Sequence, residues 1–320
     1  MGLQGREYES RGCMPLRATT QSPAHPSVNG PVSASALPHP MNSFTFIDGT
    51  PRLALDLAGK GPLLLFMHGI GGNRGNWQDQ MPVFAQHFAC VAWDARGYGA
   101  SDDYDGPLAF DDFVADLLRV LDHFGVERAH LVGLSMGGRI AMRAALLHPG
   151  RIATLTLVDT HEGFEAFSIA QRQAFVDSRR APLLAGCQPA DIADAVARSL
   201  VGPNAQSEHL QQLVDSIAAL HKDSYIKSLQ ATVDQVVLGD IAGISAPAHF
   251  IVGAEDRLTP VAMHHEMAAK MGGAPVSVVA RAGHLSNIEN APDFNAAALQ
   301  WLLPRAALGN APIHWPSARR

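Results

Sequence analysis

Apolar residues follow two alternating patterns along the chain, which predict strands and helices in turn. Continuous apolar runs of strand length lie at residues 62–67, 89–93, 129–134, 152–158, 248–253 and 276–280. Segments with apolar residues at helical spacing follow them, at residues 76–88, 110–124, 136–147, 260–271 and 294–303. Continuous runs are typical of strands that are buried on both faces. The order therefore predicts an α/β fold with a mainly parallel sheet between two layers of helices.

Three segments depart from this alternation. Residues 161–240 contain helical windows but no run of strand length, which predicts an inserted helical cap. Residues 1–40 are rich in Pro, Ser and Ala without sustained periodicity, which predicts a disordered N-terminal tail. Residues 304–320 are predicted to form a loose, basic C-terminal tail. The α/β core is expected to take residues 41–160 and 241–303, and its first part begins with a β-hairpin.

Composition and charge favour a small molecule as the partner. The net charge of −6 is spread over 320 residues without long blocks of one sign, so we expect no nucleic-acid partner. No apolar run approaches the roughly 18 residues that cross a membrane, so we expect no membrane insertion. The three cysteines form no C-x-x-C pair, which argues against a zinc site and favours the cytoplasm. We expect no metal and no organic cofactor, and the pattern specifies no oligomeric state.

The change of period at Ser135 is the strongest chemical signal in the chain. A buried strand is predicted to end at this serine, and a helix is predicted to begin directly after it. Gly133 and Gly137 flank the serine at the spacing G-x-S-x-G, where a tight strand-to-helix turn has no room for side chains. Such a turn lifts the hydroxyl clear of the sheet. Ser135 is therefore the candidate nucleophile.

The serine requires two partners from elsewhere in the chain, because a hydroxyl needs a base and a histidine base needs a carboxylate that fixes its tautomer. His284 follows the last predicted strand, at the carboxyl edge of the sheet where active sites gather. Asp256 follows the preceding strand and is the candidate acid, with Glu255 and Asp159 as rivals. Adjacent residues of an extended segment point to opposite sides, so only one of Glu255 and Asp256 can face His284.

A glycine-rich loop at residues 68–72 is the second candidate element of the site. The N–H of Ile70 in this loop and the N–H of Met136 after the serine are the candidate oxyanion hole. His68 is predicted to tie its own loop to neighbouring backbone. The charged segment 94–102 is likewise predicted to be a turn with internal hydrogen bonds.

The cap is expected to select the substrate, because the core supplies the same chemistry to any member of a fold. Its aromatic residues either line an apolar pocket or pack the cap helices together. They are Phe164, Phe167, Phe175 and Tyr225. A substrate with a carboxylate would need a cation of the cap near the pocket. The cations of the cap are Arg172, Arg179, Arg180, Arg198, Lys222 and Lys227.

Five motifs stand in one order along the chain: His68-Gly-Ile-Gly-Gly72, the turn 94–102, Gly133-Leu-Ser-Met-Gly137, Gly253-Ala-Glu-Asp256 and Gly283-His284. Together they resemble the α/β-hydrolase superfamily over about residues 42–303. The elbow and the segment 282–290 are similar to those of 3-oxoadipate enol-lactonases, which open a small lactone ring in aromatic catabolism. The resemblance implies an α/β-hydrolase fold with a cap.

These observations predict a serine hydrolase that acts on a small ester or lactone. In this interpretation Ser135 attacks, His284 transfers the proton and Asp256 orients the imidazole. Two alternatives stay open at this point. One is a hydrolase that cleaves a C–C bond of a ring-cleavage product with the same triad, and the other is a non-catalytic ligand receptor on the same fold.

Overall fold

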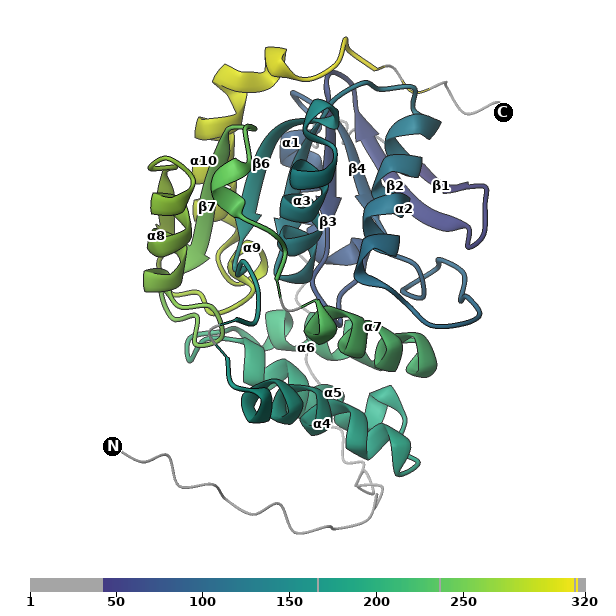
Figure 1. The fold of residues 1–320 in the computed structure, drawn as a ribbon. Helices are drawn as coiled ribbons and strands as arrows, with labels where there is room; N and C mark the ends of the chain where they lie inside the picture. Colours follow the sequence, from purple (N-terminus) through teal and green to yellow (C-terminus); the bar gives the residue numbers. More distant parts are fainter. Residues whose placement is uncertain (1–42, 166, 236, 314, 316–320) are drawn as a thin grey trace, which may run out of the picture.

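The centre of the molecule is an eight-stranded, mainly parallel sheet (Figure 1). The computed structural model describes residues 43–165, 167–235, 237–313 and 315. The expectation for residues 1–40 lies outside these described residues. In spatial order the strands are β1 (Ser43–Ile47), β2 (Leu53–Gly59), β4 (Ala89–Trp93), β3 (Leu63–Met67), β5 (Ala129–Leu134), β6 (Ile152–Val158), β7 (Ala248–Gly253) and β8 (Val276–Val279). β1 pairs with β2 and β2 with β4 in antiparallel fashion, and every later pair is parallel.

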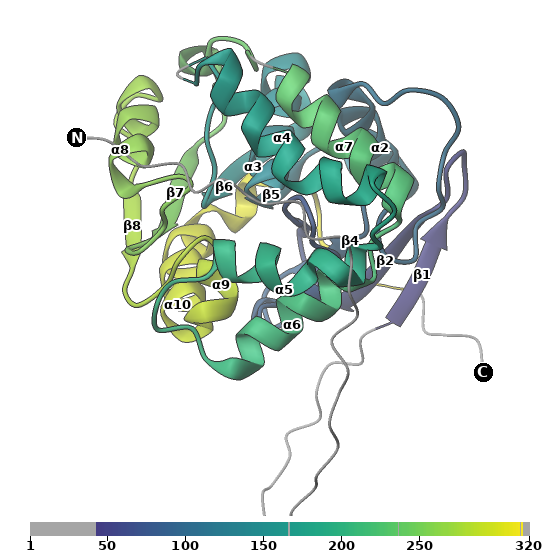
Figure 2. The ribbon, with the colours of Figure 1, turned by 90° about the horizontal axis from the view of Figure 1, so that it is seen from below.

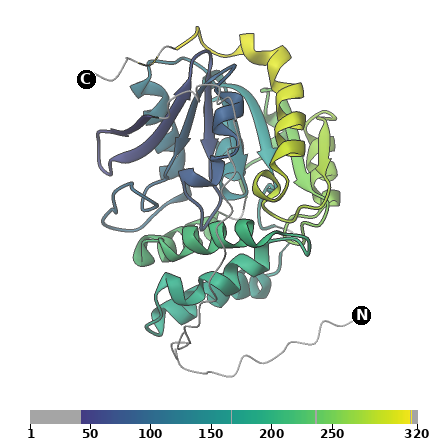
Figure 3. The ribbon, with the colours of Figure 1, turned by 180° about the vertical axis from the view of Figure 1, so that it is seen from behind.

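Helices cover both faces of this sheet. α2 (Phe110–His123), α3 (Met136–Leu147) and α8 (Val261–Lys270) lie on one face, as Figure 2 shows. α1 (Met81–Phe84), α9 (Ser286–Glu289) and α10 (Ala291–Leu302) lie on the other (Figures 1 and 3). The strands β3 to β7 are buried along their whole length because both of their faces are covered, which explains their continuous apolar runs. The predicted α/β fold is confirmed.

Four further helices lie over the carboxyl edge of the sheet (Figures 1 and 3). They are α4 (Ile169–Leu184), α5 (Pro189–Leu200), α6 (Ser207–Ala218) and α7 (Lys222–Asp234). α4 begins at a capping box in which Ser168 accepts from the Gln171 N–H and Gln171 accepts from the Ser168 N–H. This layer of helices, which we call the cap, occupies the segment between β6 and β7. No helix of the described residues has the length and apolar character needed to span a membrane.

Two expectations from the sequence are wrong in detail. The continuous helix over residues 76–88 is instead the 3₁₀ turn η1 (Arg74–Trp77) followed by the single turn α1. Pro82 lies in the first turn of α1, where its missing N–H costs nothing, and it starts a new segment there. The chain after residue 303 is not loose where it is described, since η4 (Leu303–Leu308) continues from α10 and Ile313 forms a two-way backbone bridge with Gly61.

Candidate active site

Ser135 lies at the sharp turn between β5 and α3. Its backbone has φ 52° and ψ −111°, in a region that side chains rarely adopt and that costs of the order of 1–3 kcal/mol. The turn is held from both sides, because the Ser135 N–H donates to the carbonyl of Val158 at 2.8 Å and the Thr160 hydroxyl donates to the Ser135 carbonyl at 2.7 Å. The strained turn places the serine side chain beyond the end of the sheet.

The two flanking glycines are required by the packing of this turn. A Cβ at Gly133 would lie 2.4 Å from the carbonyl oxygen of Gly137. A Cβ at Gly137 would lie 2.3 Å from the carbonyl oxygen of Met67, on the neighbouring strand β3. Both distances are shorter than real Cβ contacts, so the G-x-S-x-G spacing records how closely α3 approaches β3 and β5.

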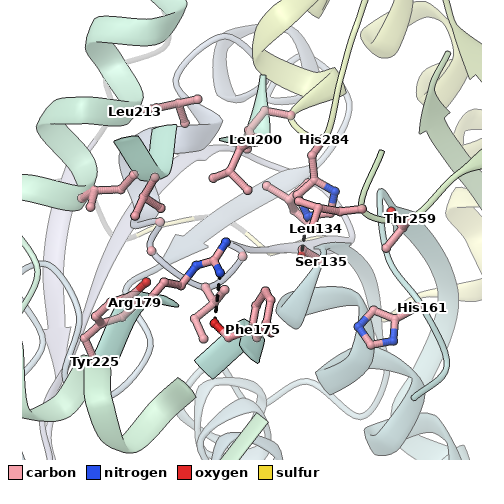
Figure 4. Close-up of a pocket in the computed structure, with 18 of the residues that line it drawn as sticks. Leu134, Ser135, His161, Phe175, Arg179, Leu200, Leu213, Tyr225, Thr259 and His284 are labelled. Carbon is pink, nitrogen blue, oxygen red and sulfur yellow. Dashed lines mark hydrogen bonds between the residues drawn. The ribbon is translucent and has the colours of Figure 1, made fainter. Parts of the chain in front are cut away.

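Ser135, His284 and Asp256 form one hydrogen-bonded chain. The Nε2 atom of His284 lies 3.0 Å from Ser135 Oγ (Figure 4). The Nδ1 atom of His284 lies 2.9 Å from Asp256 Oδ2. Asp256 is buried and accepts three further bonds, from the N–H of Leu258, the N–H of Thr259 and the Thr259 hydroxyl. These contacts hold the carboxylate in place against the imidazole.

The rival acids have other partners. Glu255 accepts a hydrogen bond from the Asn204 side chain in the cap, 2.8 Å away. Asp159 is fully buried at the end of β6, where it accepts bonds from the N–H of Gly253 and from both the N–H and the hydroxyl of Ser286. Asp159 therefore ties β7 and the loop after His284 to the end of β6.

The backbone donors expected for an oxyanion hole lie beside the serine. Ile70 and Ser135 line the same cavity, and Met136 is the first residue of α3. Among the described residues, neither the N–H of Ile70 nor that of Met136 donates to another group. His68, in contrast, is buried with its Nε2 accepting the N–H of Ala95, which is the structural role expected for it.

The chain matches the family model described as the alpha/beta hydrolase fold over residues 62–291. It belongs to the α/β-hydrolase family. This hydrolase is 28% identical to 3-oxoadipate enol-lactonase 2 of Acinetobacter baylyi over 239 residues, which cover 74% of this chain and 86% of that protein. It is also similar to a hydrolase from Pseudomonas aeruginosa PA01, with TM-score 0.73 and 30% identity over 81% of this chain and 98% of that one. The enol-lactonase from Burkholderia xenovorans LB400 aligns with TM-score 0.70 and 25% identity over 81% and 100% of the two chains.

The electrostatics of the α/β-hydrolase site favour a charged acid and a basic histidine. Burial lowers the pKa of His284, but the Asp256 carboxylate, together with Asp159 and Glu289, raises it by more, so this pKa lies above its usual value. Burial raises the pKa of Asp256, and His284 with the bonds from Thr259 lowers it by more. Burial and the charge of Asp256 raise the pKa of Asp159 to about 8. The two buried aspartates thus differ in their environment, and only Asp256 touches the imidazole.

The serine of the α/β-hydrolase faces a cavity of about 480 Å³ between the core and the cap. All four aromatic residues of the cap line it, so they do more than pack the cap helices together. Two of the six cap cations also line it, namely Arg172 and Arg179. His161 lies on the wall as well, and burial lowers its pKa to about 3, which keeps its ring neutral. Among residues 43–313 as described, no group of three or more acidic, His or Cys side chains is arranged to hold a metal ion.

The cap of the α/β-hydrolase is bonded directly to the histidine loop. The N–H of His284 donates to the carbonyl of Leu200, the last residue of α5, at 3.0 Å. Glu289 is buried and accepts the N–H of Gly202 in the cap at 2.8 Å, and its other oxygen accepts the N–H of Leu285 at 3.2 Å. Reasoning from the sequence did not find Glu289. A buried acid five residues after a loop histidine has no motif of its own.

Proposed function

We propose that this α/β-hydrolase cleaves a small carboxylic ester or lactone through an acyl-enzyme on Ser135. The single observation that carries the proposal is the hydrogen-bonded chain from Asp256 through His284 to Ser135, which opens on a largely apolar cavity. The names of the enol-lactonases from Acinetobacter baylyi and Burkholderia xenovorans support a lactone as one form of the substrate.

In the proposed reaction, Ser135 Oγ attacks the carbonyl carbon while His284 Nε2 takes the hydroxyl proton. The carbonyl oxygen becomes an oxyanion, and the N–H groups of Ile70 and Met136 donate to it. The bond between the carbonyl carbon and the leaving oxygen then breaks, and the imidazolium gives its proton to that oxygen. Asp256 stabilises the imidazolium during both transfers.

Water completes the cycle by attacking the acyl-enzyme. His284 takes one proton from the water, the bond to Ser135 breaks, and the same proton returns to the serine oxygen. An ester releases an alcohol and an acid in two separate steps. A lactone keeps its leaving oxygen tethered to the acyl group, so the only product is one ring-opened acid.

Labelling and turnover test this proposal together. A fluorophosphonate probe should modify Ser135 in the parent protein and fail to modify Ser135→Ala, while the matched control Ser207→Ala, an exposed serine at the start of α6, should label normally. A panel of para-nitrophenyl esters, lactones and C–C ring-cleavage products should show Ser135-dependent turnover of an ester or a lactone, with kcat lowered at least about 10⁴-fold in Ser135→Ala.

Two outcomes would contradict the proposal. Turnover confined to the ring-cleavage products would favour C–C hydrolysis, and tight binding without turnover of any compound would favour a ligand receptor. Circular dichroism of Ser135→Ala should match the parent, because removing one hydroxyl from the edge of a cavity leaves the core packing unchanged.

A further inference from the structure

We propose that Arg179 binds a carboxylate carried by the substrate, away from the bond that Ser135 attacks, and thereby selects anionic esters or lactones. This inference rests on the proposed hydrolysis and adds the charge of the substrate to it. It is carried by the position of Arg179 on the cavity wall and by the partners that its guanidinium has there.

One face of α4 is turned toward the cavity. Arg172, Phe175 and Arg179 follow one another at spacings of three and four residues, which places them in a row along the helix, and all three line the cavity. Among the described residues that line this cavity there is no Asp or Glu. The side of the cavity that α4 forms is therefore cationic and otherwise mostly apolar.

The guanidinium of Arg179 has only neutral partners among the described residues. Its Nη1 donates to the carbonyl of Phe175 and to the Ser178 hydroxyl, each at 3.1 Å, and its carbon lies 4.2 Å from the centre of the Phe175 ring. Burial lowers the pKa of the Arg179 guanidinium, and the neighbouring Tyr225 side chain opposes this change by raising it. Figure 4 shows Arg179 beside Tyr225 and Phe175, and Ser135 and His284 line the same cavity from the core.

Other cations of the cap are already engaged. Arg180 pairs with Asp177 at 2.9 Å and also donates to Gln230. Arg198 pairs with Asp194 at 2.9 Å on the exposed side of α5. Arg180 and Arg198 therefore each have a carboxylate counterion, whereas Arg179 has none in the part of the chain that the structure describes. A charge on a partly desolvated wall is costly when unpaired, and an anionic ligand removes that cost.

The shape and charge of the Arg179 guanidinium determine which ligand group it can bind. A planar fork of N–H donors matches a carboxylate, which can accept two parallel bonds from it. The Phe175 ring stacks on the guanidinium of Arg179 and restricts its orientation, so the side chain loses less rotamer freedom when the ligand binds. Arg172 also lines the cavity, but no ring stacking or hydrogen bond to its guanidinium holds it among the described residues. Arg179 is therefore the assigned carboxylate partner.

A charge-matched pair of substrates tests the assignment. The acidic substrates are the para-nitrophenyl monoesters of glutaric, adipic and pimelic acids, and the neutral controls carry a methyl ester in place of the free carboxylate. Arg179→Gln should lower kcat/KM for the preferred acidic ester by about 10- to 100-fold, mostly through KM, because a hydrogen bond to a charged group is lost. The same variant should change kcat/KM of the neutral ester by less than about 3-fold.

Three companion variants sharpen the result. Arg180 lies on the same helix as Arg179 but pairs with Asp177. Arg180→Gln should therefore leave the ratio of acidic to neutral turnover unchanged. Arg179→Lys keeps the charge without the fork and should fall between the parent and Arg179→Gln. Arg172→Gln should disturb the ratio less than Arg179→Gln.

The assignment is overturned if Arg179→Gln lowers turnover of both esters by the same factor, or if Arg172→Gln carries the charge-specific loss instead. Failure of the proposed hydrolysis looks different, because Ser135→Ala would then keep the parent's turnover of the neutral ester. Ser135-dependent turnover without a charge-specific effect of Arg179 would remove only the carboxylate assignment.

Discussion

Replacing Asp256 by Asn tests the proposed acid with almost no change of shape. The two oxygens of Asp256 have separate partners in the structure. Oδ1 accepts the N–H groups of Leu258 and Thr259 at 2.8 and 3.0 Å, and Oδ2 faces His284 Nδ1 at 2.9 Å and the Thr259 hydroxyl, which can also accept a hydrogen bond, at 2.6 Å. An asparagine keeps its oxygen toward the backbone donors and turns its NH₂ toward the imidazole. Nδ1 must then accept, and the ring proton moves to Nε2, next to Ser135.

The magnitude follows from this change of tautomer. With Nε2 protonated, His284 cannot take the proton of Ser135, and loss of the correct tautomer costs about 10⁴-fold in kcat in serine proteases. This corresponds to about 5 kcal/mol of lost transition-state stabilisation. The free energy of unfolding should fall by no more than about 1 kcal/mol, because the backbone bonds to the side chain survive.

Asp159→Asn should show the opposite pattern. Both oxygens of Asp159 face donors, namely the N–H of Gly253 and the N–H and hydroxyl of Ser286, so an NH₂ group meets a donor in either orientation. We expect a loss of about 1–3 kcal/mol in unfolding free energy and a smaller loss of kcat than in Asp256→Asn. Steady-state hydrolysis of a para-nitrophenyl ester and urea denaturation measure both quantities. Greater loss of kcat in Asp159→Asn would assign the acid to the end of β6 and refute the reasoning.

Two further predictions concern the base and the elbow. Because Asp256 raises the pKa of His284 and only neutral imidazole can accept a proton, kcat/KM should rise with pH and reach half its maximum above about pH 6.5; a midpoint at or below that value would contradict the charge on Asp256. Gly137→Ala would place a Cβ 2.3 Å from the Met67 carbonyl, so urea denaturation should show a loss of about 1–3 kcal/mol, and an unchanged midpoint would show that α3 can move away from β3.

The sheet and the hydrogen-bonded chain at its edge could be predicted because their signals are local. Buried parallel strands read as continuous apolar runs, and the carboxyl ends of such strands meet at one edge. The order of the strands therefore places Ser135, Asp256 and His284 near one another without any knowledge of their side-chain contacts. The same reasoning places the Ile70 loop at that edge.

Features that depend on distant contacts could not be predicted in this way. The bridge between Gly61 and Ile313 joins single residues, which leaves no period in either segment. The uncompensated charge of Arg179 depends on which way α4 turns over the cavity, although the spacing of Asp177 and Arg180 already indicates that Arg180 has a partner. Glu289 is recognisable only once the cap and the histidine loop are seen together.

The bond from the His284 N–H to the Leu200 carbonyl ties one end of α5 to the loop of the proposed base. A cap that lifted at this end would carry the carbonyl away and leave the proposed base with one restraint fewer, and the Gly202 contact with Glu289 would break with it. Opening of the cap at this end would therefore loosen His284 at the moment when the substrate enters. A motion that moved the far side of the cap outward would instead admit substrate while His284 kept its orientation toward Ser135.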